Sequence, residues 1–234
     1  MINIDDRLKL CAEFVSGNGI AVDVGTDHAY LAVYLISNGI CEKAIACDLR
    51  KGPLESARKH ISNEGFEDKI ETILSDGLEK ISPDNVSDII IAGMGGELIA
   101  RIISKAEWVS ENKVNLILQP MTKAHDLRKF LFENGFKIKD EKAVKSEQFI
   151  YSVINAEYSD EPISYEAFEL YCGGLDFCRE TDREYLSVQA DRLINAGSGM
   201  LKSENKNDDI ISKGKEKIKI GRLISDRLDQ YRKD

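Results

Sequence analysis

Short apolar runs alternate with longer amphipathic stretches over about the first two thirds of the chain. Five runs are nearly continuous in apolar, mostly β-branched residues, as buried parallel strands are, at residues 20–24, 43–47, 70–74, 88–92 and 115–118. Two further runs, 136–144 and 149–156, follow one another closely and indicate an antiparallel hairpin. Because helical patterns separate the first five runs, the sequence predicts an α/β fold with a doubly wound sheet of seven strands.

Helical patterns without strands flank this region. Residues 5–15 predict a leading helix with Leu8, Ala12 and Val15 on one stripe. After about residue 160 the pattern predicts a helix pair, 182–195 and 208–232, joined by a loop over 196–208 that is rich in Gly, Ser and Asn. We therefore expect a catalytic domain over 1–157 and a C-terminal helical domain, coiled-coil-like in style, over 158–234.

Composition narrows the class of protein. The chain has 234 residues, 42% of them hydrophobic, which suffices for a sizeable core. We find no apolar run near the ~18 residues of a membrane span and no secretory signal. The five cysteines are odd in number and form no CxxC pair. We expect a cytoplasmic protein with no membrane association, no disulfide framework and no metal.

The net charge of -9 at pH 7 argues against a polyanionic partner. The distribution of charge is uneven, however. Residues 202–234 contain ten Lys and Arg against seven Asp and Glu, with a cluster over 213–222. Such a cluster is usually a solvated helix face, and beside a nucleic-acid substrate it becomes a phosphate contact.

The turn after the first strand carries the first candidate chemistry. It reads Asp23-Val24-Gly25-Thr26-Asp27, and in open α/β sheets ligands bind at this edge. Asp27 stands where the dinucleotide fingerprint has its second glycine, and a carboxylate there repels pyrophosphate. Two acids around one glycine suit a cationic ligand such as S-adenosylmethionine. The alternative is an Asp-rich tight turn that binds nothing.

Two more acids follow the next two strands. Asp48 lies at about the offset from Gly25 at which an acid reaches ribose hydroxyls. Asp76 ends the third strand, where a carboxylate can accept from an adenine amino group. Each alone fits a helix cap or a turn; together with the first turn they outline a nucleoside with a cationic tail. Leu49 and Gly77, which follow the two acids, complete the expected cofactor site.

The fourth and fifth strands end in a second group of candidates. Gly93, Gly95 and Gly96 leave bare backbone where the cofactor's methyl end and the substrate should meet, unless they form only a flexible turn. Met94, between these glycines, and Gly95 are candidate substrate contacts. Gln119 and Pro120 end the fifth strand. The Gln119 amide is a candidate to read a base edge, the alternative being a solvated side chain beside a strand-terminating proline.

These segments resemble the successive motifs of bacterial tRNA (adenine(22)-N(1))-methyltransferases. The resemblance spans about residues 5–157 and rests on five blocks: DVGTDHAYL (23–31), DLRKGPLESA (48–57), SDGL (75–78), IAGMGG (91–96) and LQPMTKAHDLRKFL (118–131). It implies a class I, Rossmann-like methyltransferase sheet with a helical appendage. It also implies S-adenosylmethionine-dependent methylation of N1 of an adenine at position 22, in the D-arm region of tRNA.

By matching position, the resemblance places five residues around the cofactor and Asp27 in the active site: Asp23, Gly25, Asp48, Asp76 and Gly93. Neutral adenine N1 has a free lone pair, so the reaction requires no general base. We expect Asp27 to be the catalytic carboxylate, stabilising charge that develops on the ring.

Because N1 lies on the pairing edge, the base must leave the stack to react. Tyr30 is a candidate stacking platform, although a core position is the alternative, and His28 is a candidate contact at the helix start. Basic residues expected at the mouth of the site or on the helix pair are Arg7, Lys9, Lys123, Arg128, Lys129, Lys215 and Lys219.

Two other functions remain open from the residues alone. One is a methyltransferase for a small molecule or a protein, which needs the same acids without a basic surface. The other is a non-catalytic tRNA-binding protein that keeps the fold. For either, as for the tRNA methyltransferase, we expect a monomer or a weak homodimer.

Overall fold

A computed structural model describes residues 3–161, 163–203 and 207–231. The chain forms two compact units, Met1–Ser164 and Tyr165–Asp234. The division falls a few residues beyond the boundary expected at 157, because the last strand runs to Tyr158 and the residues up to Ser164 belong to the first unit.

The first unit is built on a seven-stranded sheet in the order β3-β2-β1-β4-β5-β7-β6. The strands β1 to β5 pair in parallel, and β7 pairs antiparallel with both β5 and β6. The predicted α/β fold is confirmed. The strands are β1 (Ile20–Val24), β2 (Lys43–Asp48), β3 (Ile70–Leu74), β4 (Val86–Gly95), β5 (Asn115–Thr122), β6 (Phe136–Ser146) and β7 (Phe149–Tyr158).

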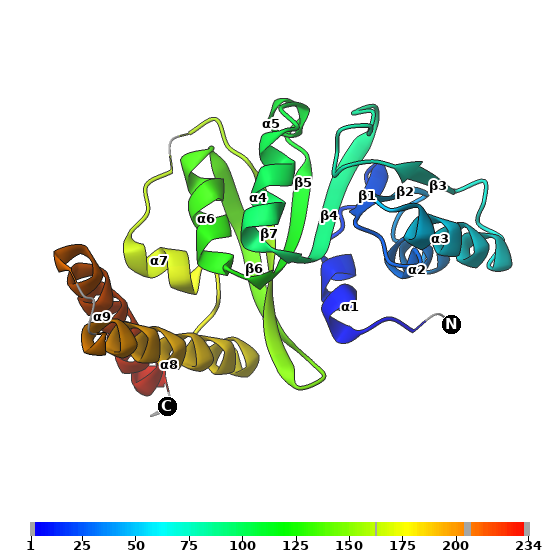
Figure 1. Cartoon of the computed structure of the whole chain (residues 1–234). Coiled ribbons are helices and arrows are strands. Elements are labelled where there is room, and N and C mark those ends of the chain that lie inside the picture. Colours follow the sequence, from blue (N-terminus) through cyan, green and yellow to red (C-terminus); the bar gives the residue numbers. More distant parts are fainter. Residues whose placement is uncertain (1–2, 162, 204–206, 232–234) are drawn as a thin grey trace. The chain divides into compact units, whose positions relative to one another are not determined.

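Helices cover both faces of this sheet and bury two apolar cores (Figure 1). One core packs α4 (Gly96–Ser104), α5 (Trp108–Glu111) and α6 (Ala124–Glu133) against the sheet. The other packs α1 (Asp6–Glu13), α2 (Tyr30–Ser37) and α3 (Lys51–Asn63) against the opposite face. The β1–α2 turn therefore opens at the carboxyl edge of the sheet, where the candidate residues cluster.

Two strands run further than their apolar runs predict. We expected β4 to end at Ala92 and β5 at Leu118, yet the strands reach Gly95 and Thr122. Pairing resumes after irregularities, with Met94 opposite Pro120 and Gly95 opposite Thr122. The glycine-rich segment is thus held as an irregular strand end rather than as a flexible turn.

Arg128 lies inside the unit and not at the mouth of the site, so that expectation was wrong. Its side chain is 1% exposed and forms a two-pronged ion pair with fully buried Glu141, at 2.6 and 3.1 Å. A buried guanidinium needs such a partner, since removing one charge leaves the other unpaired. The ion pair joins α6 to β6, and the sequence pattern does not predict it, because the two residues lie 13 positions apart.

The second unit contains α7 (Ala167–Cys172) and two long helices, α8 (Glu180–Lys202) and α9 (Asp208–Tyr231). The expected helix pair is present, but the loop was placed too early, because α8 continues through residues 196–202. Gly197 lies against the Gly214 backbone and Ile218 of α9, so a glycine that looked like a turn residue permits close helix packing. Residues 204–206 of the expected loop and residue 232 of the last helix lie outside the described residues.

Candidate active site

A pocket of about 350 Å³ opens at the carboxyl ends of β1 to β4. Its lining brings together seven of the residues expected from the sequence: Gly25, Asp48, Leu49, Asp76, Gly77, Gly93 and Met94. Seven others line it as well: Val24, Arg50, Ser75, Ala92, Leu98, Arg101 and Ile102. Arg50 and Ser75 lie within two residues of the predicted acids Asp48 and Asp76. The lining residues of α4 were missed, because nothing in the sequence distinguishes them from residues of the core.

The turn after β1 is shaped by Gly25. The backbone N–H groups of Gly25 and Thr26 both donate to the Cys47 carbonyl, at 2.8 and 2.9 Å, which ties the turn to β2. Gly25 has φ +76, and a Cβ at this position would collide with the Met94 methyl. Glycine adopts this positive φ without strain and has no Cβ that would meet Met94.

Asp48 is the buried acid of the pocket, with a side chain 8% exposed. Its Oδ1 accepts a 2.7 Å hydrogen bond from the Arg50 backbone N–H, which orients the carboxylate. Asp76 is half exposed, and Lys105 Nζ lies 3.7 Å from its Oδ2. The two expected acids therefore line one pocket but differ in solvation.

Asp23 lies near this pocket without lining it. Its carboxylate is buried and accepts a 2.6 Å hydrogen bond from the Thr26 hydroxyl. Burial raises its pKa to about 6; the Thr26 bond and Arg7 act in the opposite direction, while Asp48 adds to the rise. A cationic ligand nearby would favour the ionised form.

Gln119 is fully buried, so the alternative of a solvated side chain was wrong. Its Oε1 accepts hydrogen bonds from Arg7 Nη1 at 2.7 Å and from the Gly93 N–H at 2.9 Å. Gly93 has φ +79. The amide therefore connects the leading helix to the glycine-rich strand end, and neighbouring Pro120 is buried beside it.

Asp27, His28 and Tyr30 lie outside the pocket lining. Asp27 and His28 belong to the loop between β1 and α2, and Tyr30 is the first residue of α2. The Asp27 side chain is 81% exposed, and His28 Nε2 lies 3.4 Å from its Oδ1. Tyr30 is 44% exposed, so the alternative of a core position was wrong. Its ring centroid is 4.8 Å from that of His60, a residue of α3 that the sequence reasoning did not select.

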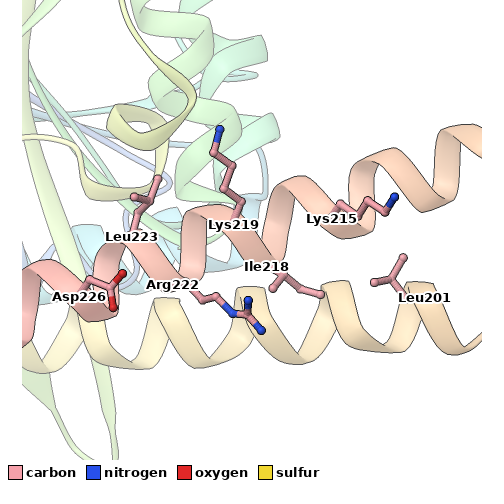
Figure 2. A pocket seen from close by; sticks show the side chains of 7 residues that line it. All are labelled: Leu201, Lys215, Ile218, Lys219, Arg222, Leu223 and Asp226. Carbon is pink, nitrogen blue, oxygen red and sulfur yellow. The ribbon is translucent and has the colours of Figure 1, made fainter.

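The second unit carries its own groove, of about 480 Å³, along α9. Figure 2 shows its lining: Leu201 of α8 with Lys215, Ile218, Lys219, Arg222, Leu223 and Asp226 of α9. The lining contains three cations, one acid and three apolar side chains, and Lys215 and Lys219 are exposed. The two predicted lysines thus share one groove.

Among the described residues, no group of three or more His, Cys, Asp or Glu is arranged to hold a metal ion. Within the same ranges, we find no helix long and apolar enough to cross a bilayer. Burial raises the pKa of the Cys11 and Cys47 thiols to about 12, so both are neutral at physiological pH.

The sheet order, the acids after consecutive strands and the glycine-lined pocket define a class I methyltransferase. Residues 4–154 match the family described as a methyltransferase domain. The chain is 33% identical to the tRNA (adenine(22)-N(1))-methyltransferase of Bacillus subtilis (strain 168) over 174 residues, covering 74% of this chain and 73% of that protein. It belongs to the tRNA (adenine(22)-N(1))-methyltransferase family.

Solved structures of similar proteins match most of the length of the chain. The B. subtilis M1A22 tRNA methyltransferase superposes with a TM-score of 0.79 at 25% identity, covering 100% of this chain and 99% of that one. A Streptococcus pneumoniae protein in complex with S-adenosyl-L-methionine gives 0.80 at 30% identity, covering 96% and 99%.

Proposed function

We propose that this protein transfers a methyl group from S-adenosylmethionine to N1 of adenine 22 in tRNA, giving 1-methyladenosine. The observation that carries the proposal is the pocket at the carboxyl edge of the sheet, with buried Asp48 and half-exposed Asp76 beside three glycines. Family membership supports the choice of an adenine in tRNA over a small molecule or a protein.

Residues of the pocket fit a nucleoside with a cationic tail. Asp48, oriented by the Arg50 N–H, is suited to accept from ribose hydroxyls, and Asp76, flanked by Gly77, from the adenine amino group. Leu49 and Met94 supply apolar surface. Gly25 and Gly93 leave room for the tail, and Asp23 contributes negative charge once ionised. When bound, S-adenosylmethionine supplies an electrophilic methyl group.

Asp27 is our candidate for the catalytic carboxylate. Adenine N1 already carries a lone pair, so no residue needs to remove a proton from it, but the product ring is cationic. An acceptor for the N6 amino group orients the base and stabilises the developing charge by the same contact. The exposed position of Asp27 on the β1–α2 loop leaves it accessible to an incoming base.

The target base must be extruded before N1 can react. The exposed ring of Tyr30, next to His28, offers a stacking surface at the start of α2, three residues after Asp27. We assign Gln119 and Arg7 to holding Gly93, since Gln119 Oε1 accepts hydrogen bonds from both Arg7 and the Gly93 N–H. Gly95 and Pro120 adjoin this network and shape the same strand ends.

The second unit is proposed to bind RNA. Lys215, Lys219 and Arg222 along the α9 groove suit phosphates, and its apolar side chains suit a sugar or base (Figure 2). With this role the protein would act in the cytoplasm, where tRNA is modified, as a monomer or a weak homodimer.

The proposal is tested by incubating the protein with labelled S-adenosylmethionine and unmodified tRNA, then digesting the tRNA to nucleosides. We expect label in 1-methyladenosine, located at adenine 22, and its loss when that adenine is replaced by guanine. Unlabelled tRNA would refute the proposal. Calorimetry without S-adenosylmethionine binding would favour a non-catalytic tRNA-binding protein.

The role of Asp27 is tested by Asp27→Ala. We expect the Kd for S-adenosylmethionine to stay within about threefold and kcat to fall by about 100-fold or more, as for loss of an interaction made in the transition state. An equal loss of cofactor affinity and of turnover would make Asp27 a cofactor ligand instead.

A further inference from the structure

The loop that carries Asp27 has an unusual backbone. His28 and Ala29 are consecutive residues with left-handed φ values, +57 and +56, although neither is glycine. Non-glycine residues in this region cost of order 1 kcal/mol each and persist only where the surroundings hold them. Ala29 is fully buried and precedes the first residue of α2, so the two residues set the direction in which α2 starts.

His60 is the side chain that contacts this strained turn. It lies on α3, and its Nδ1 is 2.8 Å from the His28 carbonyl oxygen. A carbonyl can only accept, so Nδ1 must carry the proton. Its ring is also 4.8 Å from that of Tyr30, which in turn lies 5.5 Å from His28. Since α2 and α3 pack on the same face of the sheet, this contact joins two neighbouring helices (Figure 1).

We propose that His60 is a positioning residue for methyl transfer: its hydrogen bond to the His28 carbonyl holds the turn that aims Asp27 and the Tyr30 ring at the target base. The inference rests on the proposed function, in which these two residues meet the base. His60 itself lies outside the lining of the cofactor pocket. It should therefore act on turnover of tRNA and not on cofactor affinity.

Two substitutions separate the hydrogen bond from the ring. His60→Phe keeps an aromatic ring beside Tyr30 but has no donor, while His60→Asn loses the ring and keeps an N–H donor near the place of Nδ1. We expect His60→Phe to lower kcat with tRNA by about 10-fold or more and His60→Asn to recover most of it. The Kd for S-adenosylmethionine, measured by calorimetry, should stay within about twofold in both, which also shows that both variants fold.

The same two substitutions at Glu55, an exposed residue of the same helix, provide a matched control and should leave kcat unchanged. Nitrogen NMR on the wild-type protein should find neutral His60 as the Nδ1–H tautomer. Provided that the wild-type protein labels tRNA, any of four results would overturn the inference. These are an unchanged kcat in His60→Phe, an equal loss of kcat in both His60 variants, a parallel loss of cofactor affinity, and an Nε2–H tautomer. If the wild-type protein does not label tRNA, the proposed function fails and this inference fails with it.

Discussion

Individual carboxylates in this protein share a residue type but differ in environment. Asp27 is 81% exposed, Asp48 lines the pocket with one oxygen bonded to backbone, and Asp23 is buried against Thr26. Because charge is costly to bury, the pKa of Asp23 is raised to about 6. The three acids are therefore suited to different tasks, although they look alike in the sequence.

Because the pKa of Asp23 is raised, the protonated form of this residue favours folding, whereas the ionised form favours binding of the cationic cofactor. Protonation stabilises the fold; that contribution is complete below the usual value near 3.9 and is lost as the pH rises through about 6. Without cofactor, we expect Asp23→Asn to be more stable than wild type at about pH 7.5, by up to about 3 kcal/mol, and equal to it near pH 4. At neutral pH the variant should bind S-adenosylmethionine more weakly.

Urea denaturation across this pH range measures the first effect, and calorimetry measures the second. Asp27→Asn is the control, since it makes the same substitution at a carboxylate that is 81% exposed, so that a difference between the two variants reports the burial of Asp23. A stability difference between Asp23→Asn and wild type that does not vary with pH would contradict the assignment.

At the scale of elements, the decisive contacts are those between different helices and strands. Arg128 pairs α6 with β6, and Gln119 links α1 to the end of β4 through Arg7 and Gly93. In the second unit, Gly197 and Gly214 let α8 and α9 approach closely enough for backbone atoms to meet. Glycines that look like turn residues in the sequence therefore lie at the packing interface between the two helices.

Two glycines of α8 test this packing. An alanine Cβ at Gly197 would meet the Gly214 carbonyl oxygen and Ile218, whereas at Gly199 it would meet nothing within 4 Å. We expect Gly197→Ala to destabilise the protein by about 1–3 kcal/mol through overpacking. Gly199→Ala should stabilise it by up to about 1 kcal/mol, because alanine is the better helix former.

Thermal unfolding of the full chain, followed by helical circular dichroism, distinguishes the two outcomes. Both substitutions make the same chemical change in one helix, so a difference between them reports packing against α9. Equal effects of the two would show that the close approach of the helices does not contribute to stability.

At the scale of the whole molecule, net charge and function first point in opposite directions. The chain carries -9 at pH 7, yet its family methylates a polyanion. The positions of the charges resolve the conflict, because two acids line the pocket at the carboxyl edge of the sheet while cations gather along α9. Affinity for tRNA should therefore depend on a few local contacts and fall steeply with added salt.

We expect the α9 groove to account for part of that salt dependence. We expect Lys215→Glu combined with Lys219→Glu to raise the KM for tRNA by about 10-fold or more and to flatten the salt dependence by roughly one slope unit per lost phosphate contact. The KM for S-adenosylmethionine should not change. Steady-state kinetics at several salt concentrations provide the measurement.

Lys213→Glu serves as the control, since Lys213 is exposed on the same helix outside the groove and pairs with Asp209 at 2.7 Å. If the two groove substitutions leave the KM for tRNA unchanged, or if Lys213→Glu raises it as much, the groove is a packing feature and not a tRNA contact.

The strands, their order of appearance and the acids and glycines at their ends were predictable from the sequence. Buried parallel strands must be continuously apolar, so the polar residues that interrupt the pattern mark the edge where ligands bind. Asp48, Asp76 and Gly93 were found in this way. The C-terminal helix pair was predictable from its periodicity, although its loop was not.

The tertiary structure alone decided which polar side chains are buried and with what partners. Gln119 and Arg128 look like surface residues in the sequence, and His60 lies 32 positions from the carbonyl that it contacts. Local patterns report the spacing of apolar residues along one element. They contain no information on which distant donor meets which acceptor, because that depends on how the elements pack together.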